Sequence, residues 1–253
     1  MRELLARLTD PDPEVRRDAY EELSLEMDDA TAAAILDLVT TGPSEEVRAD
    51  AIIALGPMIE ECGMDYDDAL GLEPDDEFGP PVSRETFAAI VERIRAIYDD
   101  EAQPKLLRRR AFEVLVRDLE PWQREAIRKH YRSSDLEWRL TAVFAMGMMT
   151  GFEKELVEVV ISSEGVLLSE AVRSAGQIGA TRAAPRIREL ATSEETERDL
   201  RCEAILALPH VDPDAFEILD ELTAAHDPVI AEAAEEALEE LGVMRGGFDL
   251  DEE

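Results

Sequence analysis

The stretch DPDPEVRRDAYEEL, residues 10–23, combines a helix-start signal with a helical pattern of apolar residues. Its second Asp-Pro pair places a capping side chain before a proline at the first helical position. Val15, Ala19 and Leu23 then follow at intervals of four residues, so they lie on one face of a helix. A single copy predicts only that a helix begins here.

The same apolar triplet returns along the chain at nearly constant intervals. Its first position follows that of the preceding copy after 32, 60, 31, 29, 33 and 30 residues. A period near 30 residues is typical of stacked helical repeats, and the interval of 60 indicates an insertion or a degraded repeat. The further copies are Val47-Ala51-Leu55, Leu107-Ala111-Leu115, Trp138-Ala142-Met146, Leu167-Ala171-Ala175, Leu200-Ala204-Leu208 and Ile230-Ala234-Leu238.

We call the helix that carries each apolar triplet a triplet helix. A second short apolar helix, the intervening helix, lies between successive triplet helices, as in ATAAAILDLV at 30–39 and PDAFEILDEL at 213–222. We therefore expect a unit in which the triplet helix comes first and the intervening helix second. A lone helix pair cannot bury both apolar faces, so neighbouring pairs must stack. No long alternating run rich in β-branched and aromatic residues is present, and aromatic residues make up only 5% of the chain. The pattern predicts an all-α fold.

The pattern D-P-x-x-x-V-R-x-x-A-x-x-A-L-G resembles the short HEAT repeat shared with phycobilisome-lyase-like proteins. The best match is SAGQIGATRAAPRIREL at 174–190, where Gly179, Ala183 and Pro185 fall at positions that this family favours. The resemblance implies a right-handed α-solenoid of about seven stacked antiparallel helix pairs, continuous over residues 1–245. It also implies that the second helix of each pair lines the concave face. Because the motif residues are packing and capping positions, they say little about activity.

Residues 62–82, CGMDYDDALGLEPDDEFGPPV, interrupt the second repeat with an acidic stretch. Its acids do not have the spacing of a calcium-binding loop. We expect a solvated insertion loop here; the alternative is a partner-binding loop anchored by Tyr66 and Phe78. Residues 246–253, GGFDLDEE, are expected to form a flexible acidic tail.

Residues 105–139 hold ten Lys or Arg against six acidic residues, although the chain as a whole has a net charge of −34. Arginines recur here at intervals of four residues, which places them on one helical face. Two more follow on a later intervening helix, so the resemblance implies that all of them share one concave groove. The candidate partner-binding arginines are Arg124, Arg128, Arg132, Arg182 and Arg186.

Arginine forks bind carboxylates and phosphates in bidentate fashion, so an acidic or phosphorylated segment of another protein is the ligand these arginines favour. The alternative is that they pair with glutamates on neighbouring repeats. The overall charge repels nucleic acid and anionic membrane, and neither is expected as a partner. Abundant acids with only three lysines resemble proteins of salt-adapted microbes; a cationic partner is the other explanation of the charge.

No catalytic, metal-binding or cofactor-binding motif is present. His130, His210 and His226 are scattered, Cys62 and Cys202 stand far apart, and no G-x-S-x-G, H-E-x-x-H or phosphate-binding glycine loop occurs. No signal peptide or long apolar run is seen, so we expect a cytoplasmic protein. The sequence favours a non-catalytic interaction scaffold or adaptor without a cofactor. The alternative is an enzyme or enzyme subunit of HEAT-like fold, resembling a phycobilin lyase or, less closely, a DNA glycosylase.

Overall fold

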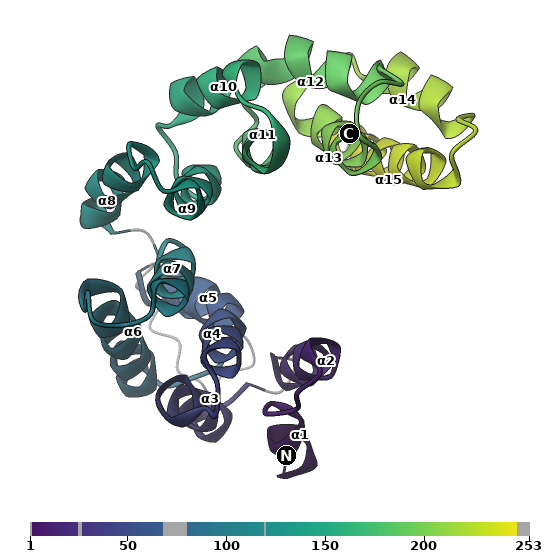
Figure 1. Ribbon diagram of the computed structural model, residues 1–253. Helices are drawn as coiled ribbons and strands as arrows, with labels where there is room; N and C mark the ends of the chain where they lie inside the picture. Colours follow the sequence, from purple (N-terminus) through teal and green to yellow (C-terminus); the bar gives the residue numbers. More distant parts are fainter. Residues whose placement is uncertain (1, 25–26, 68–79, 119, 247–253) are drawn as a thin grey trace, which may run out of the picture. The chain divides into compact units, whose positions relative to one another are not determined.

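The computed structural model describes residues 2–24, 27–67, 80–118 and 120–246 (Figure 1). All regular elements in these ranges are helices, so the predicted all-α class is confirmed. The chain separates into two compact units, residues 1–124 and 125–253, which are described separately. The expected single stack over residues 1–245 therefore stays a prediction.

The first unit begins with the opening stretch of the sequence, which forms α2 as its Asp-Pro signal predicts. Asp12 accepts a hydrogen bond from the backbone N–H of Glu14 in the first turn of this helix (3.0 Å). The helices of this unit are α1 (Arg2–Arg7), α2 (Pro13–Ser24), α3 (Asp29–Thr41), α4 (Glu45–Ala54), α5 (Gly56–Asp67), α6 (Arg84–Asp99) and α7 (Lys105–Leu115).

The helix α8 (Pro121–Tyr131) crosses the boundary between the units, and the second unit continues from it to the end of the described chain. Its further elements are α9 (Leu136–Gly147), α10 (Glu153–Ser162), α11 (Gly165–Gln177), the 3-10 turn η1 (Thr181–Ala183), α12 (Ala184–Thr192), α13 (Arg198–Val211), α14 (Phe216–Thr223) and α15 (Pro228–Gly246).

The packing of the helices defines which neighbours form a pair. The helices α3 and α4, α6 and α7, α10 and α11, α12 and α13, and α14 and α15 pack extensively, whereas α9 barely contacts α10. The triplet helix is thus the second member of its pair, and our expectation that it comes first is wrong. With α1/α2, and with α8/α9, which meet at the stacked rings of His130 and Trp138, the described residues form the predicted seven pairs, and α5 stands outside them.

The triplet helices also form the tighter of two rows. In the second unit α9, α11, α13 and α15 pack closely one after another, whereas α10 scarcely touches α12. Figure 1 shows the same unit curving with the triplet helices on its inner side and α10, α12 and α14 on its outer side. The expectation that the intervening helices line the concave face is therefore wrong for this unit.

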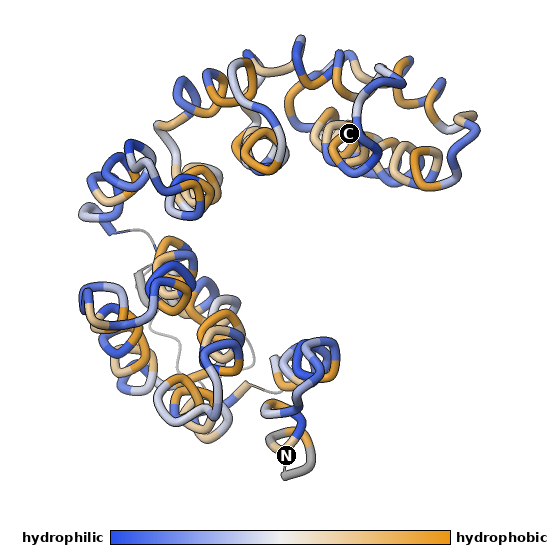
Figure 2. The backbone as a smooth tube through the Cα atoms, viewed as in Figure 1, coloured by the Kyte–Doolittle hydropathy of each residue, from blue (hydrophilic) through white to orange (hydrophobic). Residues whose placement is uncertain are grey.

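Small residues at the centre of each triplet explain this close packing. The middle alanines of all seven triplets are fully buried, and Figure 2 shows apolar and polar residues alternating around the helices. An alanine at the contact lets two helices approach closely without a loss of helix propensity. These alanines are Ala19, Ala51, Ala111, Ala142, Ala171, Ala204 and Ala234.

In several repeats an arginine follows the first apolar residue of the triplet, and it closes the turn between the two helices of a pair. Arg48 Nε donates to the carbonyl of Val39 at 2.9 Å, and the same bond joins Arg108 to Tyr98 at 3.1 Å and Arg201 to Ala191 at 2.9 Å. Each acceptor lies in the last turn of the preceding helix, where carbonyls lack intrahelical partners. The repeat therefore needs an arginine here for the turn rather than for a ligand.

The predicted insertion is in part helical. Its first residues, 62–67, are the end of α5, and residues 68–79 lie outside the described part. Val82 is buried, and the backbone N–H of Ser83 donates to the Asp29 carboxylate at 2.7 Å. The chain thus returns to the stack at a fixed point before α6. The expected tail at 246–253 lies outside the described residues except for Gly246, which ends α15.

Candidate partner-binding surfaces

The arginine-bearing helix α8 is held in place by contacts at both ends. At its start the buried Gln123 side chain donates to the carbonyls of Leu115 and Asp118, both at 2.7 Å. Near its end the His130 ring stacks on Trp138 of α9 with 4.0 Å between ring centroids. These contacts fix the helix face that carries the candidate arginines.

The end of α8, with the residue that follows it, presents three cations to solvent. Arg128, Lys129 and Arg132 are exposed, and none of them forms an ion pair with any residue that the structure describes. Arg128 instead lies over the Phe152 ring, with its guanidinium carbon 5.3 Å from the ring centroid. Cations at a helix C-terminus are favoured by the helix dipole, which accounts for their presence without a ligand. Arg124, one turn earlier, is half-buried.

The other two candidates lie on η1 and on α12. Arg182 is exposed, and Arg186 Nη1 forms an ion pair with Glu189 Oε2 at 2.7 Å. Figure 1 shows α10 between α8 and α12, and α10 exposes Glu153 and Glu158. The expectation of one shared concave groove is therefore wrong. The arginines form two separate groups, both on the row of intervening helices.

Internal ion pairing, the alternative reading of the arginines, holds for many of them. Arg16 Nε lies 2.7 Å from Asp50, and Arg117 Nη1 lies 2.5 Å from Glu60. Arg186 follows this pattern within its own helix. Within the described ranges Arg128, Arg132 and Arg182 do not form an ion pair.

The two aromatic candidates of the insertion are not tested. Tyr66 belongs to α5, and Phe78 falls in 68–79, outside the described residues. A loop anchored by this pair stays a prediction.

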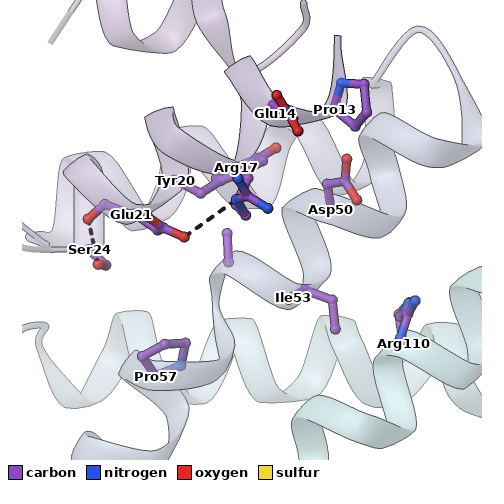
Figure 3. Close-up of a pocket in the computed structure, with 11 residues that line it drawn as sticks. Pro13, Glu14, Arg17, Tyr20, Glu21, Ser24, Asp50, Ile53, Pro57 and Arg110 are labelled. Carbon is purple, nitrogen blue, oxygen red and sulfur yellow. Dashed lines mark hydrogen bonds and ion pairs between the residues drawn. The ribbon is translucent and has the colours of Figure 1, made fainter. Parts of the chain in front are cut away.

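A pocket of about 630 Å³ lies among the triplet helices of the first unit, a feature that the sequence did not reveal (Figure 3). Ile53, an apolar residue next to the core position 52, is 41% exposed there. The pocket is lined by α2, α4, the start of α5 and one side chain of α7. Its lining residues are Pro13, Glu14, Arg17, Tyr20, Glu21, Ser24, Asp50, Ile53, Ala54, Pro57 and Arg110.

Tyr20 is the most buried polar side chain of this pocket. It is 8% exposed, and its hydroxyl has no hydrogen-bond partner among the described residues. Burial raises the pKa of Tyr20, and the Asp50 carboxylate adds to the effect. The hydroxyl therefore stays protonated and keeps a hydrogen-bond donor without an acceptor.

Two further functional classes find no support in the described residues. No group of three or more His, Cys, Asp or Glu is arranged to hold a metal ion there. None of the helices in those ranges combines the length and apolar character that crossing a membrane requires.

Comparisons with known proteins found one family model and several solved structures that resemble this chain. Residues 1–56 match the family model for HEAT repeats. An engineered protein is 17% identical, with a TM-score of 0.45 over 99% of this chain and 84% of its own. Human deoxyhypusine hydroxylase in complex with glycerol is 15% identical, with a TM-score of 0.39 over 96% of both chains. A designed armadillo repeat protein in complex with the peptide (KR)4 is 16% identical, with a TM-score of 0.36 over 93% and 98%.

No curated protein matches the sequence. The match over residues 1–56 and the stacked helix pairs nevertheless define the class: this is an all-helical repeat protein. The HEAT repeat predicted from the sequence is confirmed.

Proposed function

We propose that this protein is a non-catalytic, cytoplasmic interaction scaffold that binds an acidic or phosphorylated segment of another protein at the end of α8. The observation that supports it is the group of three exposed cations, Arg128, Lys129 and Arg132, without ion pairs in the described residues. In a chain with 60 acidic and 26 basic residues, a carboxylate is seldom far from an arginine. Three cations without an ion pair at the end of one helix are available to an external anion.

The arrangement suits a phosphate or a pair of carboxylates. Arg132 follows the last residue of α8, and its backbone N–H donates to the carbonyl of Arg128 at 3.3 Å, which continues the helical turn. The side chains of Arg128 and Arg132 therefore leave the chain about 5–6 Å apart on one face. Two guanidinium forks at that separation can hold one phosphate between them by charge-assisted hydrogen bonds. The Phe152 ring beneath Arg128 limits the freedom of its guanidinium, which lowers the entropy lost on binding.

The test is a fluorescence anisotropy titration with a labelled peptide that contains phosphoserine flanked by glutamates. We expect the double variant Arg128→Glu/Arg132→Glu to weaken binding at least about tenfold and to reduce its salt dependence. Arg93→Glu is the matched control, because Arg93 is also exposed without an ion pair in the described residues but lies on α6. Equal affinity in wild type and double variant would refute the assigned surface.

A pull-down from native-host lysate extends this test to the physiological partner. The wild-type chain and the same double variant serve as baits, and both are first shown to be equally helical. A protein captured by wild type and lost from the variant is the expected result. The alternative function, an enzyme or enzyme subunit of HEAT-like fold, ranks second because no described group of side chains favours a particular reaction.

A further inference from the structure

The pocket of the first unit is distinct in place and in charge from the surface on α8. It lies on the triplet helices α2 and α4, with Pro57 of α5 and Arg110 of α7 at its edge (Figure 3). Its volume of about 630 Å³ falls within the range of known ligand sites. A site here would therefore give the protein a second binding activity.

The floor of the pocket is apolar and already formed. The Tyr20 ring, Ile53, Ala54 and Pro57 line it, and Ile53, the residue before the last of α4, is 41% exposed. An exposed isoleucine beside a concave surface gains free energy when an apolar side chain covers it. The floor thus fits a branched aliphatic side chain.

The rim has a surplus of negative charge. Asp50 is paired with Arg16 at 2.7 Å, and Arg110 is paired with Glu113 at 2.5 Å, so both pairs are largely neutralised. Of the remaining charges on α2, Glu14 has no ion pair in the described ranges.

The one remaining cation of the rim offsets one of these charges and is only loosely paired. Arg17 reaches Glu21 only at 3.7 Å, a long contact in a side chain that is mostly exposed. A cation on a ligand can replace this loose pairing. The rim therefore favours a lysine or an arginine next to the apolar group.

The pocket also contains a buried donor that lacks an acceptor. The Tyr20 hydroxyl is unpartnered in the described residues, and an unpaired buried hydroxyl is costly. A peptide carbonyl is the acceptor that such a donor requires, whereas a purely aliphatic ligand would leave it unpaired. This observation is independent of the charge on the rim.

We infer that this pocket binds an extended peptide segment of a partner protein that carries a leucine-like side chain next to a lysine or arginine. The aliphatic side chain packs on Ile53 and the Tyr20 ring, and the basic side chain pairs with Glu14 and Glu21. The Tyr20 hydroxyl donates to a carbonyl of the bound peptide. The inference does not rest on the proposed α8 surface, because it uses another row of helices and the opposite charge.

The test uses the full chain and a fluorescein-labelled probe, the peptide Ser-Leu-Lys-Ser-Leu-Lys-Ser. We expect it to bind at least about fivefold more tightly than the same peptide with glutamate for lysine or with serine for leucine. Equal affinity for the original probe and for the peptide with serine in place of leucine would overturn the inference. Such a result would mean that the acidic chain attracts any cationic peptide, whether or not the pocket takes part.

Variants locate the binding. Ile53→Ser should lower the affinity for the probe at least about fivefold. Ile161→Ser, the same change at an isoleucine that is 63% exposed on α10, should leave the affinity unchanged. An Ile53→Ser chain that binds like wild type would refute the site. Tyr20→Phe keeps the shape of the ring and should weaken binding while the free protein melts no lower than wild type. An unaltered affinity in Tyr20→Phe would also overturn the assignment.

Discussion

The arginine after the first apolar position of the repeat shows how one residue serves the fold. In Arg48, Arg108 and Arg201 the Nε–H group donates to a carbonyl at the end of the preceding helix. A lysine has no planar fork to reach such a carbonyl while its stem stays packed. The excess of arginine over lysine in this chain thus has in part a structural cause.

The contribution of this bond can be measured at Arg201. We expect Arg201→Ala to lower the free energy of unfolding by about 1–2 kcal/mol, because the Ala191 carbonyl loses a charged donor. Arg182→Ala is the control, since Arg182 is exposed and has no ion pair in the described part of the chain. Urea unfolding followed by circular dichroism gives both values. Equal stabilities of the two variants would contradict the role of this bond.

Buried tyrosines make stability sensitive to alkaline pH. Burial, with a smaller contribution from the Asp99 carboxylate, raises the pKa of Tyr98 to about 12 from an ordinary value of 10.0. The folded chain then retains a proton that the unfolded chain loses between these two values. Stability is therefore complete below about pH 10 and falls by up to about 1.4 kcal/mol per pH unit above it.

Urea unfolding at about pH 9 and about pH 11 measures this loss. Tyr98→Phe removes the titrating group, so we expect a smaller fall in the free energy of unfolding between the two pH values. The chain has only three lysines, which limits the competing titration in this range. A fall in Tyr98→Phe as large as in wild type would contradict the expectation.

At the scale of the helix, neighbouring triplet helices require small residues where they meet. A Cβ on Gly147 of α9 would lie 2.9 Å from both Cα and Cβ of Ser174 on α11 and 2.5 Å from Gln177 Oε1. These distances are shorter than van der Waals contact, and one of them involves backbone. The two helices can approach this closely only because residue 147 has no side chain.

Two glycine-to-alanine changes separate packing from helix propensity. Gly147→Ala should destabilise the protein by about 1–3 kcal/mol, because α11 must move away from α9. Gly242→Ala on α15 meets no atom within 4 Å and should stabilise it by about 0.5–1 kcal/mol. Thermal and urea unfolding of both variants provide the comparison. A Gly147→Ala chain as stable as wild type would show that the helices adjust without cost.

The elements that could be predicted from sequence are those set by local chemistry. The period near 30 residues, the Asp-Pro start and the triplet face at Val15, Ala19 and Leu23 all depend on residues close in the chain, and the structure has them. Which neighbour pairs with a triplet helix could not be predicted, because a short turn and another helix lie on both sides of it in the sequence. Only the contacts between helices show which neighbour is the pair.

The candidate sites were harder to predict for the same reason. Exposure of Arg128 and Arg132 followed from helical periodicity, but their lack of ion pairs depends on side chains from other helices. The pocket could not be seen at all, since Tyr20, Ile53 and Pro57 come from three helices and their sequence pattern is that of ordinary packing. Their proximity is a tertiary property.

At the scale of the whole molecule, the net charge of −34 dominates. Like charges repel one another across a folded chain, and salt screens this repulsion over about 10 Å at 0.1 M and about 3 Å at 1 M. We expect the melting temperature to rise strongly between low salt and molar KCl. Differential scanning calorimetry at matched pH tests this, with sucrose as a control for general stabilisation. A melting temperature independent of KCl would contradict salt adaptation.

The unequal packing of the two helix rows makes the second unit easier to bend than to stretch. The triplet helices are closely joined along the inner row, whereas α10 and α12 scarcely touch on the outer row. Bending that spreads the outer helices breaks few contacts, while stretching the inner row breaks many. The unit should therefore flex in one direction at little cost and resist extension, so a bound partner can alter its curvature without melting a helix.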